Sequence, residues 1–136
     1  MQTNPINQCF NVLVTGAPLG SSAMASALRF CWASEQRGQA VSQVFFFASA
    51  SAVANDWVLP LDDEPHWAEL WRGYAEHSGA DLMICIASGE RHGVIDVDQV
   101  EHTGFDHSNV AQGFKVVGLG VLHDAMLGAD CMLHFK

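Results

Sequence analysis

Residues 81–93, with the sequence DLMICIASGERHG, predict the central strand of the fold and the turn that leaves it. Residues 82–87 form a short, almost wholly apolar run, which is typical of a strand covered on both faces of a parallel sheet. Cys85 lies near the carboxyl end of this run, and Ser88 and Gly89 interrupt it. Because open α/β sheets place their functional groups at the carboxyl ends of the strands, we expect any chemistry of this chain near Cys85.

Strand and helix patterns alternate on both sides of this run. Further strands are expected at residues 10–15, 41–47, 114–117 and 130–135. Helices are expected at residues 21–37, 65–77, 96–102 and 118–128. Residues 48–54 and 103–113 are interpreted as loops. This order predicts an α/β fold, a three-layer α/β/α sandwich with a mostly parallel sheet.

The length and composition indicate one domain that associates with other chains. The 136 residues suffice for a single core, which we place at residues 10–136 after an N-terminal extension at residues 1–9. Apolar residues make up 49% of the chain and charged residues only 15%. With so little charge to cover the surface, we expect part of it to face other subunits in a hexamer or another oligomer.

The net charge of -9, with six Lys and Arg residues, argues against direct binding of nucleic acid or of anionic membranes. Residues 1–9 carry neither the basic nor the apolar part of a signal peptide. The longest apolar stretch, residues 44–54, is about half the length that spans a bilayer and contains two serines. These features predict a cytoplasmic protein.

The four cysteines, at positions 9, 31, 85 and 131, contain no CxxC pair and no spacing typical of a zinc site. Cys31 lies on the apolar face of its predicted helix, and Cys9 and Cys131 flank predicted strands, so all three are interpreted as structural. Cys131 and His134 have an interval like that of metal ligands, but on the predicted strand their side chains would point to opposite faces. We therefore expect no metal and no cofactor.

Cys85 has two interpretations. Pattern alone favours a buried cysteine that packs as a small apolar side chain. A reactive cysteine must ionise, and since a free thiol has a pKa near 8.5, half ionisation at neutral pH requires about 2 kcal/mol of stabilisation. The start of a following helix and a cation, Arg91 or protonated His92, can supply that amount, whereas Glu90 opposes it.

Residues 16–20, GAPLG, suggest a second kind of site. This loop follows the first predicted strand and precedes Ser21 and Ser22 at a helix start, an arrangement that can hold an anion. It matches neither GxGxxG nor a Walker sequence, so a tight turn between strand and helix is the simpler interpretation. The chain also lacks the GxSxG motif of a nucleophilic serine.

Several short motifs in a fixed order connect the chain to a known family. They are Thr15-Gly16 with Gly20, residues 44–46 (VFF), residues 84–87 (ICIA) with Arg91, residues 93–96 (GVID), Asn109, residues 112–114 (QGF) and residues 118–120 (GLG). In their order and spacing, residues 10–135 resemble the DsrE-like sulfur-relay proteins. The resemblance is strongest to the DsrE-type subunit of the TusBCD and DsrEFH complexes.

The resemblance implies a sulfurtransferase in which Cys85 is catalytic and carries sulfane sulfur as a persulfide. It also implies TusB-like and TusC-like companion subunits, a TusA-like donor, a TusE-like acceptor, and a role in tRNA 2-thiouridine synthesis or in sulfur oxidation. Relatives have two arginines after the cysteine, where this chain has Arg91-His92, so one of the two expected thiolate-stabilising cations is titratable. Two alternatives remain at this stage, a non-catalytic assembly subunit and a module that binds a small anion or nucleotide at residues 16–20.

Overall fold

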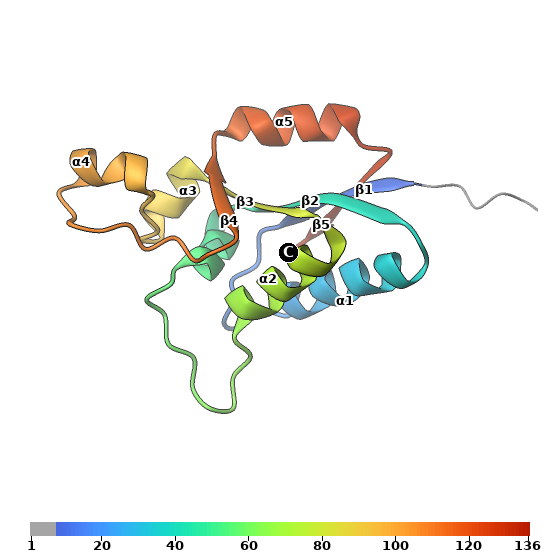
Figure 1. Ribbon diagram of the computed structural model, residues 1–136, viewed down its shortest axis with the longest axis horizontal. Coiled ribbons are helices and arrows are strands. Elements are labelled where there is room, and N and C mark those ends of the chain that lie inside the picture. The colour runs from blue at the N-terminus through green and yellow to red at the C-terminus, as the bar shows by residue number, and fades with distance from the viewer. Residues whose placement is uncertain (1–7) are drawn as a thin grey trace, which may run out of the picture.

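The computed structural model describes residues 8–136 (Figure 1). Five parallel strands form one sheet in the order β4-β3-β2-β1-β5. The strands are β1 (Cys9–Val14), β2 (Ala40–Phe46), β3 (Asp81–Cys85), β4 (Phe114–Val117) and β5 (Cys131–Phe135). The helices are α1 (Ala23–Gln36), α2 (Trp67–Ser78), α3 (Ile86–Arg91), α4 (Val100–Thr103) and α5 (Leu119–Gly128), with short 3-10 helices η1 (Ala48–Ala54) and η2 (Val97–Gln99).

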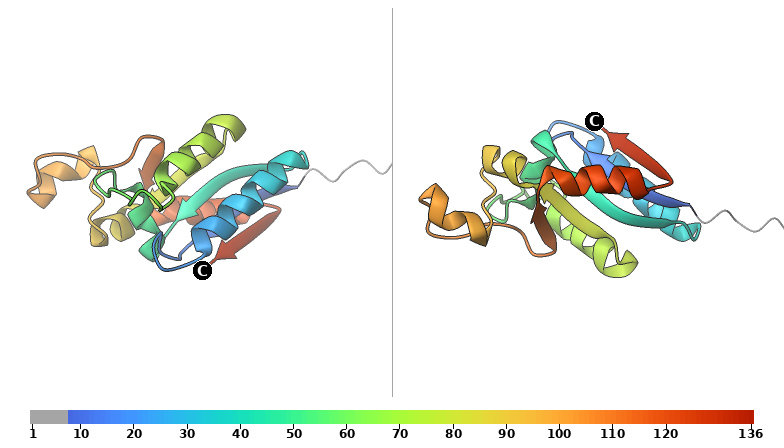
Figure 2. Two further views of the ribbon diagram at one scale, coloured as in Figure 1. Left: turned by 90° about the horizontal axis from the view of Figure 1, so that it is seen from below. Right: turned by 90° about the horizontal axis from the view of Figure 1, so that it is seen from above.

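The helices are divided unequally between the two faces of the sheet. Helices α1 and α2 cover one face, and α5 crosses the other face alone (Figures 1 and 2). Helices α3 and α4 lie at the end of the sheet where β2 and β3 finish (Figure 1). The predicted three-layer α/β/α sandwich is therefore confirmed, with one thick and one thin helical layer.

The face under α1 and α2 holds most of the core. Alternate residues of the central strands point to this side, and Val12, Val44 and Ile84 are fully buried there. Trp71 of α2 packs edge-on against Phe46, with ring centroids 5.2 Å apart. Aromatic packing of this kind anchors the two helices to the sheet.

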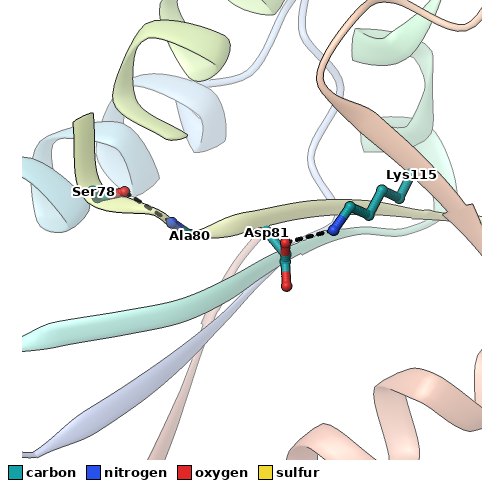
Figure 3. Close-up of polar contacts among 4 residues, drawn as sticks. All are labelled: Ser78, Ala80, Asp81 and Lys115. Atoms are coloured by element: carbon teal, nitrogen blue, oxygen red, sulfur yellow. Dashed lines mark hydrogen bonds and ion pairs between the residues drawn. The ribbon is translucent and has the colours of Figure 1, made fainter. Parts of the chain in front are cut away.

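The opposite face has a much smaller core. Its buried cluster consists of Phe45, Cys85 and Leu122, the last of which comes from α5. At the amino ends of β3 and β4 this face is open to solvent, and there Lys115 donates to Asp81 at 2.7 Å in a half-exposed ion pair (Figure 3). The single helix α5 thus seals only part of its side of the sheet.

The central strand is shorter than predicted. The run at 82–87 predicts a strand to Ala87, but β3 ends at Cys85 and the chain turns into α3 at Ile86. The neighbouring strand β4 ends at Val117, which lies opposite Cys85 in the register. Beyond that point no further β4 residue pairs with the chain, so the apolar run continues as a helix instead.

Two other segments refine the prediction. Residues 48–54, expected to be a loop, form the 3-10 helix η1, whose small side chains allow Ala50, Ser51 and Ala54 to be fully buried. The helix expected at residues 96–102 is split into η2 and α4, and Asp96 caps it as predicted, with a capping box that includes Gln99.

The start of the chain needs separate mention. Strand β1 begins at Cys9, inside the extension expected at residues 1–9, and residues 1–7 lie outside the described part of the chain. Within residues 8–136, none of the helices combines the length and the apolar character that crossing a membrane requires.

Candidate functional site

Cys85 stands at the carboxyl edge of the sheet. It is the last residue of β3 and the N-cap of α3, with an extended backbone (φ -74°, ψ 133°). Side chains alternate along a strand, so Ile84 points into the core under α1 and α2 while Cys85 points to the side of α5. The predicted position of Cys85 at the carboxyl end of its strand is therefore correct.

The Cys85 side chain is nevertheless covered, with only 4% of its surface exposed. Phe45 of β2 and Leu122 of α5 complete its buried cluster. The residues packed around this cluster are themselves only partly buried: Leu13, Phe47, Met83, Val117 and Met132. Another molecule can reach the sulfur freely only after this thin apolar cover moves.

Cys31 has a different environment, although it is also buried. It lies on α1 inside the large core, with no exposed surface. Burial raises the pKa of the Cys31 thiol from its ordinary value of 9.0 to about 12. This thiol stays protonated at neutral pH and is a structural residue, as its helical position predicts.

The two remaining cysteines are part of the sheet. Cys9 is partly exposed at the start of β1, where its sulfur and the Ser42 hydroxyl form a hydrogen bond of 2.6 Å. Cys131 is partly buried at the start of β5. Neither lies at the carboxyl edge, where β3 delivers Cys85.

Arg91 and His92, the predicted thiolate-stabilising residues, are exposed at the far end of α3. Arg91 lies six positions after Cys85, which corresponds to about 9 Å along a helix axis. Within residues 8–136, no hydrogen bond or ion pair joins either side chain to Cys85. Glu90 is held away in another direction, because its carboxylate accepts a hydrogen bond from Gln99.

Sequence reasoning missed a contact that fastens α3 to the neighbouring strand end. The backbone N–H of Ala48, which follows β2, donates to the buried hydroxyl of Ser88 at 3.0 Å. Ala48 has a φ of 53°, an unfavourable conformation for a residue with a side chain. The strained turn after β2 and the first turn of α3 therefore hold each other beside Cys85.

Asn109 connects the loops behind α3. Its side chain is buried, accepts a hydrogen bond from the N–H of Ile95 at 2.7 Å and donates to the carbonyl of Gly93 at 2.7 Å. It also donates to Asn55 at 3.2 Å, next to the end of η1. Asn109 is one of the family motifs in the sequence, but its role as a link between three loops requires the structure.

The loop at residues 16–20 is a tight connection. A side chain at Gly16 would come within 2.5 Å of the Ala23 side chain and within 2.7 Å of the backbone of Lys136, so the glycine is required for packing. The Ser21 hydroxyl accepts a hydrogen bond from the Ala23 N–H at 3.1 Å. These contacts agree with the interpretation as a turn.

No group of three or more Cys, His, Asp or Glu residues that could hold a metal ion occurs in residues 8–136.

Comparison with known proteins identifies a family and similar sequences. Residues 10–135 match the family model described as the DsrE/DsrF-like family. The protein named sulfurtransferase TusD of Proteus mirabilis (strain HI4320) is 35% identical over 130 residues, which cover 96% of this chain and 100% of that protein. The protein of the same name from Enterobacter sp. (strain 638) is 35% identical over 126 residues, which cover 93% of this chain and 98% of the relative.

The fold has a solved counterpart as well. The crystal structure of the ychN protein from E. coli superimposes with a TM-score of 0.70 at 18% sequence identity and covers 94% of this chain and 99% of that one. At this identity the likeness concerns the fold. The family match and the two relatives extend over nearly the whole chain, and as the sequence motifs predict, the chain belongs to the DsrE/DsrF-like family.

Proposed function

We propose that this chain is a sulfurtransferase subunit that carries sulfane sulfur as a persulfide on Cys85. The class of activity rests on the family and on curated relatives that are named sulfurtransferases. The choice of Cys85 rests on one observation: among the four cysteines, it alone ends a central strand at the carboxyl edge and begins a helix.

The transfer consists of two thiol–persulfide exchanges. The Cys85 thiolate attacks the terminal sulfur of a donor persulfide, a new S–S bond forms at Cys85, and the donor's S–S bond breaks to release the donor as a thiolate. An acceptor thiolate then attacks the terminal sulfur of the Cys85 persulfide, the S–S bond at Cys85 breaks, and Cys85 is released as a thiolate. Each exchange is redox-neutral overall, and the transferred sulfur stays covalently bound, so the chemistry needs no cofactor.

Two sources of positive potential support the anionic forms of Cys85. The first turn of α3 directly follows the cysteine, and the first backbone N–H groups of a helix lack partners within that helix. Arg91, together with His92 when protonated, adds a more distant charge, worth about 0.5 to 2 kcal/mol at roughly 9 Å. Both contributions are on the order of 1 kcal/mol, with the amides adjacent to Cys85 and the two side chains at the far end of α3.

Access to Cys85 requires movement of its cover. Leu122 of α5 belongs to the buried cluster of Cys85, and α5 is the only helix of residues 8–136 on that face. Helix α5 is therefore the element whose displacement exposes Cys85 with the least loss of core. Docking of a donor or an acceptor is the natural trigger for that displacement, because it replaces the apolar contacts that Leu122 gives up.

The partners are proposed from the resemblance to the family. We assign a TusA-like donor, a TusE-like acceptor and TusB-like and TusC-like companions in a cytoplasmic oligomer that serves tRNA 2-thiolation or sulfur oxidation. Participation in a sulfur-relay complex is supported by the TusD relatives. On this chain, the exposed Leu119, Met126 and Leu127 of α5 are the kind of apolar surface that companion subunits cover.

Sulfur loading of the purified chain tests the proposal. After incubation with a polysulfide under anaerobic conditions, we expect the intact mass to rise by one sulfur atom, and we expect that gain to disappear in Cys85→Ser. Cys9→Ser is the matched control, because Cys9 is more exposed than Cys85 and should leave the loading unchanged. Loading that persists in Cys85→Ser would refute the assignment.

The burial of Cys85 favours one competing function, a subunit that only supports the assembly. The same experiment separates the two. An assembly subunit takes up no sulfur on Cys85, whether alone or with its companions, and its Cys85→Ser variant supports sulfur transfer by the whole complex at the rate of the original chain.

A further inference from the structure

An exposed apolar loop joins η1 to α2. Residues 57–61 have the sequence WVLPL, and the exposed fractions are 59% for Trp57, 87% for Leu59 and 67% for Leu61. Scattered apolar side chains on a surface are ordinary, whereas several in a row indicate a site of interaction. This loop projects from the side of the sheet that α1 and α2 cover, away from α5 (Figure 1).

Hydrogen bonds at both ends hold the loop in this exposed form. At its start, the Trp57 N–H donates to the side chain of Asn55 at 2.9 Å, and the Asp56 N–H donates to the carbonyl of Asn109 at 2.8 Å. At its end, Leu61 and Glu64 form a closed turn, in which each backbone N–H donates to the other residue at 2.9 Å. A preorganised loop loses little conformational entropy when a partner binds it.

A hollow lies beside the loop and can accept a side chain. About 500 Å³ of space lies between its walls, much of it open solvent, and the enclosed part is about 80 Å³. Its walls are mainly apolar and come from four segments, among them Pro18, Leu19, Val53, Leu59 and Trp67. Pockets with a projecting apolar residue at the rim are typical of the centre of a protein interface.

Acidic residues flank the apolar run on both sides in sequence. Asp56 precedes the apolar run, and Asp62, Asp63 and Glu64 follow it. No lysine or arginine occurs between Arg37 and Arg72, so no basic residue of this segment balances them. A second copy of the chain would bring a second net charge of -9, and an anionic membrane would likewise be repelled.

We propose that loop 56–64 and its hollow form the docking surface for a different protein, one that presents an apolar side chain surrounded by lysine and arginine. The opposite charges would guide the encounter and exclude wrong partners, and the apolar contact would supply most of the affinity. Because the Cys85 side chain points to the α5 side of the sheet, a protein docked here leaves the sulfur site free. The proposal is therefore independent of the sulfur chemistry.

Site-specific photo-crosslinking in the native cells tests the proposal. Leu59 is replaced by a benzoylphenylalanine side chain, and Leu127 of α5 is the matched control, since it is equally apolar and exposed but lies on the other face. We expect one major adduct from position 59, at least fivefold stronger than the same adduct from position 127. Mass spectrometry should place the crosslink beside lysines or arginines of another protein.

Variants of the loop then test the chemistry of the contact. With the purified partner, Leu59→Ser should weaken binding at least tenfold, and the double variant Asp62→Asn with Asp63→Asn should weaken it about threefold in low salt and less in high salt. The crosslinker at Leu61 repeats the test with a second side chain. Absence of an adduct at both positions, an adduct with a second copy of this chain, or binding unaffected by these variants would overturn the proposal.

Discussion

Cys31 and Cys85 are both buried thiols, but the cores that bury them differ in size. Cys31 lies on α1 within the large core that two helices and the sheet enclose. Cys85 lies at the edge of the sheet, in a small cluster that a single helix closes. Burial alone therefore does not distinguish Cys31 from Cys85, the proposed sulfur carrier. What separates them is the amount of structure that must move before the sulfur meets solvent.

The largest expected difference concerns alkylation of the native chain. Cys85 needs only a local opening at α5, whereas Cys31 needs the opening of the main core and keeps a raised pKa. With iodoacetamide at neutral pH, peptide mass spectrometry should show Cys85 reacting at least about a hundredfold faster than Cys31, a difference of about 2.7 kcal/mol. Equal rates would mean that both thiols become accessible only through global unfolding.

Removal of the cover should widen this difference. Leu122→Ala deletes the contact that α5 makes over Cys85, and we expect about tenfold faster alkylation of Cys85 at a cost of about 2 to 4 kcal/mol in the free energy of unfolding. Leu28→Ala is the control on α1, the helix of Cys31, and should leave Cys31 unreactive. If Leu122→Ala does not change the rate at Cys85, another element gates the sulfur.

Alkaline pH should reveal the structural thiol. Since the pKa of Cys31 is about 12 in the folded chain and 9.0 as its ordinary value, the unfolded state loses this proton first as the pH rises. The contribution of this one proton to the free energy of unfolding is fully present below pH 9. It should be lost between pH 9 and 12, at about 1.4 kcal/mol per pH unit. In urea titrations, Cys31→Ala should show a shallower loss over this range than Cys85→Ala.

The smallest effect is expected from the cation on α3. Arg91→Gln should slow persulfide loading of Cys85 twofold to fivefold in low salt, and the difference should shrink in high salt, since the charge acts over roughly 9 Å. Arg37→Gln, at the exposed end of α1, is the matched control and should have no effect. A loss of loading beyond a hundredfold would show that Arg91 contacts the sulfur directly during transfer.

Much of this architecture could be predicted because its signals are local. The apolar run around Ile84, the glycine that ends α2 and the aspartate that caps η2 each act through neighbouring residues, and the structure has all three. The end of β3 could not be predicted from the run itself. It depends on where β4 stops pairing, which is a property of a segment about thirty residues away in sequence.

The candidate site follows the same division. The order of motifs predicted both the family and Cys85 as its site, and the comparisons confirm the family. The sequence also placed Arg91 and His92 close to Cys85 along the chain, but the helix between them carries both to its far end. Asn109 and Ser88 hold the loops around Cys85 through hydrogen bonds to residues up to 54 positions away, which no local pattern reveals.

The sequence by itself determined the order of strands and helices, the edge at which Cys85 emerges and the acidic, apolar character of loop 56–64, because periodicity, turn residues and charge are properties of short segments. Only the tertiary structure decided that Cys85 faces α5, that Leu122 covers it, and that a hollow opens beside Leu59. Alternation along a strand tells which residues share a face, but the packing of distant helices determines how deeply each face is buried.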